Sequence, residues 1–379
     1  PSKSGQSTPR CHTFLPGGLD VRYGRAAGIQ CDDFLIQHVG APLAFGRKGT
    51  PRCNKCLSQR GKMVENTDNT IGMTVSSTTV ETRRSFVPRD PARIRALQLT
   101  DLHLFAQPEQ PELDAKTLAD IVQLVELTDP DLLMITGDLW HENPNGQGRE
   151  YMAYAIGQIE RLGTPWLFVW GNHDRLDDYA HGHDVLACAS NSLYCGGRGA
   201  GNYSVEARDA NGESIWKFLC LNSSDRGLME PQRAWLRALA SRQPVDKSTP
   251  PIFVLCHIPV QQYQMVWERN QASGIRLEAV CSWAEDGSSL ALLQEQGPLR
   301  AYLCGHDHIN DYGGVVDGVE LIYGRATGTA GYGADSLSKG GKLVTIDAYS
   351  GHYTWESWCP DGSRWRPIPG TRIVSQVRD

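Results

Sequence analysis

The alternation of short apolar runs with segments of helical period, which begins at Ile94, limits the possible folds of this chain most strongly. Strands that alternate with helices are typical of α/β folds, in which helices cover a sheet. Apolar side chains spaced i, i+3, i+4, i+7 indicate one face of a helix. We therefore predict helices that carry four apolar stripes: Leu118, Ile121, Val122 and Val125; Met152, Ile156 and Ile159; Trp235, Leu236 and Leu239 after Pro231; and residues 290–296.

The second half of the chain also contains three dipeptides that favour tight turns between antiparallel strands. They are Asn211-Gly212, Asp317-Gly318 and Ser350-Gly351, and each lies between two strand-like segments. Hairpins among alternating strands and helices indicate sheets with both parallel and antiparallel pairs. The expected architecture is a four-layer α-β-β-α sandwich, in which two mixed sheets pack face to face and helices flank them.

Residues 1–90 differ in composition from the rest of the chain. They are rich in Gly, Ser, Thr, Pro and Arg, so we predict an irregular N-terminal extension before a domain at residues 91–379. Within the extension, Cys53 and Cys56 have the spacing of a zinc site. Three further side chains are available to complete it: Cys11, His12 and Cys31. Cys53 and Cys56 are therefore candidates for a structural zinc site, but a single Cys-x-x-Cys without a second matched pair is equally typical of free thiols in a poorly ordered arm.

The composition excludes several classes of partner. The 379 residues include 37 Lys and Arg against 43 Asp and Glu, which gives a net charge of -6. Proteins that bind nucleic acid or an anionic membrane surface usually carry a basic excess, so neither partner is expected. No apolar run approaches the roughly 20 residues that a membrane helix needs. The composition gives no indication of an oligomeric state.

The cysteines bear on the compartment. Cys220, Cys256 and Cys304 lie in apolar, strand-like runs, where buried thiols are expected rather than a disulfide framework. Buried thiols and the lack of a signal-peptide core in the first 30 residues favour a cytoplasmic protein. Because the sequence begins at Pro1, it leaves open whether a leader was removed.

Five apolar runs each lead directly into side chains that bind metal ions. Ligands of an open α/β sheet bind at the carboxyl ends of its strands, so five such ends would bring these side chains to one place. The five groups are Asp101-x-His103, Gly137-Asp138, Gly171-Asn172-His173-Asp174, His257 and Gly305-His306-Asp307-His308.

Each group taken singly is ordinary. A lone strand histidine is more often a core residue than a ligand, and Gly-Asp is often a turn. Together, however, the groups hold five of the 11 histidines, and a purely structural role would bury them with two aspartates without pairing. The joint pattern therefore predicts a metal site.

This ordered set resembles the motifs of the calcineurin-like metallophosphoesterase superfamily, over about residues 94–358. Other stretches resemble the subgroup that contains the fungal Dcr2 phosphatase and plant purple-acid-phosphatase-29-like proteins. These are Gly201-Asn-Tyr-Ser, Cys256-His-Ile-Pro, residues 305–311 and the segment from Tyr323-Gly to Gly331-Tyr-Gly. The resemblance implies the metallophosphoesterase fold and a metal-dependent phosphoric ester hydrolase, a phosphatase or a phosphodiesterase.

Two metal ions close together need a shared anionic ligand, and Asp138 is the candidate for this bridge. The resemblance implies Asp101, His103 and His308 as ligands of the first metal ion and Asn172, His257 and His306 as ligands of the second. Mixed nitrogen and oxygen ligands suit Zn, Fe, Mn or similar ions. The expected reaction is hydrolysis of a phosphomonoester or phosphodiester substrate by in-line attack of a metal-bound hydroxide.

The leaving group of such a reaction needs a proton. His173 is the candidate general acid, with Asp174 holding its imidazole. The alternative for Asp174 is a helix N-cap, since Asp is a preferred residue there. Asn310 and Asp311 are candidates for orienting the metal-bound histidines. Arg325 is a candidate for binding phosphate, with a surface ion pair as its alternative.

The chain also departs from two branches of the superfamily. Coloured purple acid phosphatases have a tyrosine three residues after the bridging Asp, where this chain has His141, so no tyrosinate-to-iron charge-transfer band is expected. His141 lies in a loop, where substrate contact and a solvated surface position are both open. The pattern Gly137-Asp-Leu-Trp-His-Glu also differs from that of the protein Ser/Thr phosphatases.

Two rival functions remain. One is a non-catalytic metal-binding or protein-interaction scaffold with the same fold, and the other is a phosphodiesterase of nucleic acid. A decayed site usually loses histidines, whereas every expected ligand position is filled here. The acidic balance disfavours the second rival.

Overall fold

The computed structural model describes residues 84–107, 110–243 and 245–374. The predicted zinc site at Cys53 and Cys56 and most of the predicted N-terminal extension lie outside these residues. Residues Arg84–Phe86 form strand β1, which pairs in parallel with β5 (Tyr203–Arg208). These three residues, which the sequence placed in the extension, therefore belong to a sheet of the domain.

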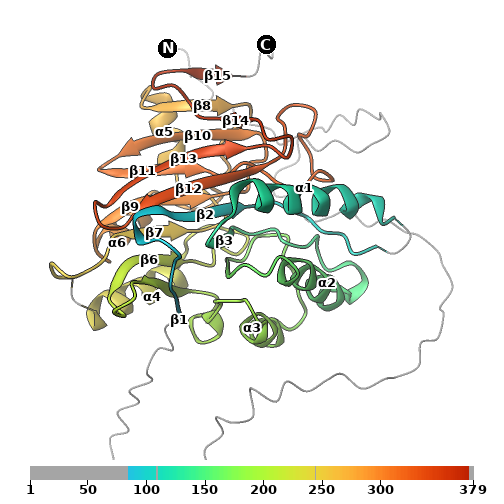
Figure 1. The fold of residues 1–379 in the computed structure, drawn as a ribbon, viewed down its shortest axis with the longest axis horizontal. Helices are drawn as coiled ribbons and strands as arrows, with labels where there is room; N and C mark the ends of the chain where they lie inside the picture. The colour runs from blue at the N-terminus through green and yellow to red at the C-terminus, as the bar shows by residue number, and fades with distance from the viewer. Residues whose placement is uncertain (1–83, 108–109, 244, 375–379) are drawn as a thin grey trace, which may run out of the picture. The chain divides into compact units, whose positions relative to one another are not determined.

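Two mixed sheets face each other in the described part of the chain (Figure 1). The nine-stranded sheet has the order β1-β5-β6-β7-β9-β11-β10-β8-β15. Its other strands are β6 (Ser214–Cys220), β7 (Ile252–Leu255), β8 (Ala272–Arg276), β9 (Leu299–Cys304), β10 (Asn310–Val316), β11 (Val319–Tyr323) and β15 (Arg372–Val374). The six-stranded sheet has the order β14-β13-β12-β2-β3-β4. Its strands are β2 (Ile94–Leu99), β3 (Leu132–Ile135), β4 (Trp166–Phe168), β12 (Gly341–Asp347), β13 (His352–Trp358) and β14 (Arg364–Trp365).

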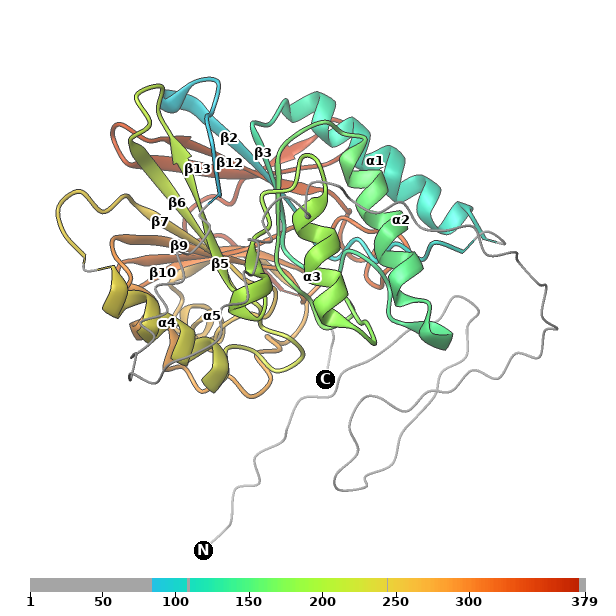
Figure 2. The same ribbon diagram turned by 90° about the horizontal axis from the view of Figure 1, so that it is seen from below.

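Helices cover the outer faces of both sheets (Figure 2). Beside the six-stranded sheet lie α1 (Glu112–Thr128), α2 (Gly148–Glu160) and α3 (Tyr179–Cys188). Over the nine-stranded sheet lie α4 (Glu230–Arg242), α5 (Gln262–Glu268) and α6 (Ser289–Gln294). Short 3-10 helices are η2 (Pro91–Arg93), η3 (Pro144–Gly146) and η4 (Gly196–Gly199). Among the described helices, none combines the length and apolar character that crossing a bilayer requires.

The nine-stranded sheet has a hydrophobic core on each of its two faces, and successive side chains of a strand enter the two cores in turn. Along β7, Phe253 and Leu255 join the core that contains the six-stranded sheet, whereas Ile252 and Val254 join the core under α4, α5 and α6. Successive side chains of a strand point to opposite faces, so a strand buried on both faces is apolar throughout. The predicted four-layer α-β-β-α sandwich is confirmed.

The three predicted hairpins are confirmed, because β5 pairs antiparallel with β6, β10 with β11 and β12 with β13. Helices α1, α2, α4 and α6 lie where the apolar stripes predicted them, whereas α3 and α5 were not predicted. The stripe of α1 differs at one position: Val122 is 45% exposed, and Leu124 is fully buried instead. Cys220, Cys256 and Cys304 are buried, as predicted.

Candidate metal centre

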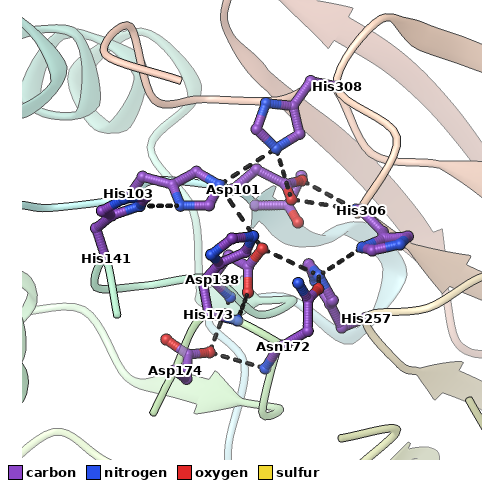
Figure 3. Close-up of polar contacts among 12 residues, drawn as sticks. Asp101, His103, Asp138, His141, Asn172, His173, Asp174, His257, His306 and His308 are labelled. Atoms are coloured by element: carbon purple, nitrogen blue, oxygen red, sulfur yellow. Dashed lines mark hydrogen bonds and ion pairs between the residues drawn. The ribbon is translucent and has the colours of Figure 1, made fainter. Parts of the chain in front are cut away.

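The side chains that follow five strand ends lie together (Figure 3). Strands β2, β3 and β4 are parallel neighbours in one sheet, and β7 and β9 are parallel neighbours in the other. Their carboxyl ends therefore meet at one edge of the sandwich. The residues brought together are Asp101, His103, Asp138, Asn172, His173, Asp174, His257, His306 and His308.

Asp101, His103, Asp138 and His308 form the first of two groups. One nitrogen or oxygen of each lies within 4.8 Å of the others, and all four residues are buried. His308 Nε2 lies 3.2 Å from His103 Nε2 and 3.3 Å from Asp101 Oδ1. Imidazole nitrogens and carboxylate oxygens at this spacing are able to hold a metal ion.

The second group converges on Nε2 of His257. Three atoms surround this nitrogen: Asn172 Oδ1 at 3.0 Å, His306 Nδ1 at 3.2 Å and Asp138 Oδ2 at 3.2 Å. Asp138 Oδ2 also lies 3.6 Å from His103 Nε2 in the first group. The carboxylate of Asp138 thus lies between the two groups, at the position that the sequence analysis gave to a bridge.

The backbone at this edge adopts a conformation that is uncommon outside glycine. Asp101, His103, Asp138 and His306 have φ values of 53°, 47°, 53° and 76°. Residues other than glycine rarely adopt a positive φ, and such conformations cluster at functional sites. The turns therefore aim these four side chains inward at a cost that the surrounding fold must offset.

Glycines beside these residues allow their close approach. A Cβ atom on Gly171 would lie 2.2 Å from Asp138 Oδ1, and one on Gly137 would lie 2.5 Å from His257 Nδ1. No larger residue fits at either position unless the site residue moves. The glycines of the Gly-Asp and Gly-Asn motifs therefore serve to bring two strand ends into contact.

The charges of the site residues favour the binding of cations. The ion pairs of Asp101 and Asp138 within the described residues are made with imidazoles. Burial alone would raise the pKa of Asp138, but His257 and His173 hold it well below its usual range. Burial alone would lower the pKa of His257, but the Asp138 carboxylate raises it to about 10. Because the site stabilises positive charge among converging lone pairs, its residues fit divalent cations.

Two contacts orient the imidazoles of the site. His257 Nδ1 lies 2.9 Å from the carbonyl oxygen of Thr136, to which it donates, so Nε2 faces the other site atoms. His103 Nδ1 lies 3.2 Å from Nδ1 of His141. His141 therefore lies against a predicted metal ligand, and burial, followed by the charge of His173, lowers its pKa to about 4. Such contacts fix the orientation of ligating histidines in metalloproteins.

Tyr332 holds His308 and was given no role by the sequence analysis. Its ring stacks on the imidazole, with 4.1 Å between centroids and an angle of 10°. Its hydroxyl accepts a hydrogen bond from the His308 N–H at 3.2 Å and donates to Glu278 Oε2 at 2.9 Å. Lys339 Nζ donates to the Tyr332 carbonyl at 2.8 Å. Tyr332, in the segment between β11 and β12, therefore packs against His308 and holds its ring and backbone in place.

The carboxylate beside His173 is that of Glu142. Glu142 Oε1 lies 2.5 Å from His173 Nδ1, and Oε2 lies 3.2 Å from Arg175 Nε. Burial alone would lower the pKa of His173, but the charges of Asp138 and Glu142 raise it. The side chain of His173 is 32% exposed, so it is accessible to solvent as well as in contact with the buried site residues.

Asp174 has a different role from the predicted one. Its two carboxylate oxygens accept four backbone N–H groups at 2.8–3.2 Å, from Asp138, Leu139, Trp140 and Gly171. The prediction that Asp174 holds the His173 imidazole therefore needs correction, since Glu142 occupies that place. The N-cap alternative is also wrong, because the N-cap of α3 is Asp178. Asp174 instead ties the turn after β3 to the turn after β4.

Three other candidates lie away from the ligand groups. Asn310 Oδ1 accepts the backbone N–H groups of Leu277 and Glu278. Asp311 pairs with Arg325 at 2.5 Å and with Lys342, and all three side chains are buried. The predicted role of Asn310 and Asp311 in orienting the histidines is therefore wrong. Arg325 makes an ion pair, as its alternative proposed, but this pair is buried and does not lie at the surface.

Fold and site together define a two-sheet α/β protein with a candidate dinuclear metal centre. Residues 94–310, more than half of the chain, match the family model described as calcineurin-like phosphoesterase. The chain therefore belongs to the calcineurin-like phosphoesterase family. The resemblance predicted from the motifs is confirmed.

The sequence identity to individual relatives is low. The chain is 25% identical over 314 residues to "Probable inactive purple acid phosphatase 28" of Arabidopsis thaliana, across 71% of this chain and 79% of that protein. It is 23% identical over 262 residues to phosphatase DCR2 of Saccharomyces cerevisiae, across 59% of this chain and 45% of that protein. A dimetal phosphatase of Danio rerio matches in structure with a TM-score of 0.42 and 15% identity, covering 68% of this chain and 96% of the other. The two sequence relatives agree with the predicted subgroup.

Proposed function

We propose that this protein is a dinuclear metal-dependent phosphoesterase that hydrolyses a phosphomonoester or a phosphodiester. The observation that supports it most is the position of Asp138 Oδ2, 3.2 Å from His257 Nε2 and 3.6 Å from His103 Nε2. One carboxylate between two groups of nitrogen and oxygen atoms is the arrangement that a pair of cations needs.

Each cation would have its own set of ligands and share Asp138. Asp101, His103 and His308 would hold the first, and Asn172, His257 and His306 the second. This donor set suits Zn, Fe, Mn or similar ions. When bound, the two cations would lower the pKa of water and stabilise negative charge on the phosphoryl oxygens.

His173 would supply the proton for the leaving group. As the bond between phosphorus and the leaving oxygen breaks, that oxygen keeps the electron pair and takes the proton from the imidazolium. The raised pKa of His173 favours the protonated form that a general acid needs near neutral pH. Glu142 at 2.5 Å fixes the proton on Nδ1 and stabilises the charged ring.

Hydrolysis of two chromogenic esters tests the proposal. The protein is stripped with a chelator, reloaded with Zn²⁺, Mn²⁺ or Fe²⁺, and assayed with p-nitrophenyl phosphate and bis-p-nitrophenyl phosphate. We expect turnover that a chelator removes and metal restores, and loss of this turnover in His257→Ala. His352→Ala removes an exposed histidine and is the matched control.

The alternative is a metal-binding scaffold without catalysis. Some relatives carry the word "inactive" in their names, which describes those proteins. Here both ligand groups and the His173–Glu142 pair are complete, which favours catalysis. Cation binding without hydrolysis of either ester, under all three metals, would support the scaffold.

A further inference from the structure

Trp283 lies at the rim of the second ligand group, in the segment between β8 and α6. Its indole Nε1 lies 2.9 Å from Nε2 of His306, and the residue is 48% exposed. Its only polar atom is directed at a residue of the candidate metal centre.

The direction of this hydrogen bond determines where His306 carries its proton. An indole N–H only donates, so His306 Nε2 must accept with its lone pair. A neutral imidazole has one such lone pair, so the proton lies on Nδ1 whenever the Trp283 contact is made.

A cation in the second group requires the opposite tautomer. His306 Nδ1 is the nitrogen that lies among the ligand atoms, 3.2 Å from His257 Nε2. Its lone pair must face the cation, which places the ring proton on Nε2. Two N–H groups would then oppose each other at the Trp283 contact. The contact and the cation are therefore mutually exclusive in this geometry.

The backbone around Trp283 is held, so its side chain is the part that has to move. The N–H of Cys281 donates to Asp307 Oδ2 at 3.2 Å, and the N–H of Ala284 donates to the Arg226 carbonyl at 3.3 Å. These bonds fix the chain within two residues on either side. Release of the indole is thus a rotation about side-chain bonds into the solvent that it already faces.

We propose that Trp283 is a positioning residue that competes with the second cation for His306. Its indole selects the tautomer of His306 that does not bind, and it rotates away when the cation binds. This inference rests on the proposed dinuclear site, but it concerns cation affinity and not turnover. The second cation therefore binds with lower affinity than it would if the same ligands made no contact with Trp283.

Removal of the indole N–H tests this competition. Trp283→Phe keeps an aromatic ring and loses the donor, so the second cation is expected to bind about 2- to 10-fold more tightly, the effect of one net hydrogen bond. Calorimetric titration of the stripped protein with Mn²⁺ measures both affinities. Trp358→Phe, which removes an N–H that donates to Glu356, is the matched control and should leave both affinities unchanged.

Tryptophan fluorescence supplies a reading that a general structural defect would not reproduce. We expect the second equivalent of Mn²⁺ to change the emission of the wild-type protein and of Trp358→Phe by more than it changes that of Trp283→Phe, in which Trp140 and Trp170 still lie beside the ligand groups. If wild type and Trp283→Phe both bind two cations, and the second cation binds both proteins with the same affinity, the competition is overturned and the dinuclear site stands. If neither wild type nor Trp283→Phe binds a second cation, both the competition and the proposed dinuclear site are overturned.

Discussion

Nδ1 of His173 lies 2.5 Å from Oε1 of Glu142, and the other oxygen of that carboxylate lies 3.2 Å from Nε of Arg175. Glu142, in the turn after β3, thus holds the imidazole of His173, which follows β4 in the chain. This cross-turn pair orients the proposed general acid and, together with the charge of Asp138, favours its protonated form.

Glu142→Gln is expected to shift the pH profile of hydrolysis. The negative charge of Glu142 helps to raise the pKa of His173, so its loss lowers that pKa. A general acid acts while it is protonated, and the alkaline limb of kcat against pH therefore moves to lower pH. Glu150→Gln, at an exposed position of α2, should leave the profile unchanged. An unshifted alkaline limb in Glu142→Gln would contradict the pairing.

His173→Ala should keep both cations but slow substrates with poor leaving groups most. General acid catalysis contributes about 10²–10⁴-fold, and a p-nitrophenolate leaving group needs little of it. The measurement compares kcat for p-nitrophenyl phosphate with kcat for an alkyl phosphate, alongside metal content. Equal losses on both esters would argue against His173 as the acid.

Tyr332→Ala is expected to weaken the first cation site. Loss of the stacked ring and of the hydroxyl bridge to Glu278 releases His308, and loss of such supporting contacts costs about 10–100-fold in metal affinity. Tyr332→Phe keeps the stack and should restore part of the affinity. Co²⁺ titration followed by visible absorption reports the ligand geometry directly. Tyr349→Ala, at a residue that is 71% exposed, is the control.

Asp311→Asn should destabilise the fold, because it leaves Arg325 and Lys342 buried without their anion. Breaking a buried ion pair in this way costs about 3–5 kcal/mol in the free energy of unfolding. Urea unfolding at pH 7 measures the difference from wild type, and Asp335→Asn at an exposed position is the control. An equal free energy of unfolding in wild type and Asp311→Asn would contradict the buried network.

The same ion pair predicts a pH dependence of stability. Burial alone would raise the pKa of Asp311, but Lys342 and Arg325 lower it below its ordinary value of 3.8. The unfolded chain therefore binds this proton more tightly than the folded chain. The contribution of Asp311 is complete above about pH 4 and is lost as the pH falls through the folded-state pKa. The difference between wild type and Asp311→Asn should thus shrink toward pH 3.

The strand ends could be predicted from the sequence, because each apolar run and its ligands are contiguous. The positions of Asp101, Asp138 and His257, which follow such runs, could be predicted from one rule: the carboxyl ends of parallel strands lie at the same edge of a sheet. The rotation of a helix is less certain, as Val122 and Leu124 show, since both fit an apolar stripe and tertiary packing selects between them.

The partners of the site residues could not be predicted in this way. Asp174 is adjacent to His173 in sequence, yet its carboxylate points to backbone N–H groups and Glu142, 31 residues earlier, reaches the imidazole. Tyr332 lies 24 residues after His308 in an irregular segment. Such contacts depend on turn conformations that local patterns do not encode.

The central claim is that Asp138 joins two cations in one site, and the metal content of Mn²⁺-loaded protein tests it most directly. Mn²⁺ suits carboxylate and imidazole ligands and not the thiols of Cys53 and Cys56. Elemental analysis should find two Mn per chain in wild type, and fewer in Asp138→Asn together with no ester hydrolysis. Two Mn per chain in Asp138→Asn with turnover equal to wild type, or no bound Mn in wild type, would contradict the account.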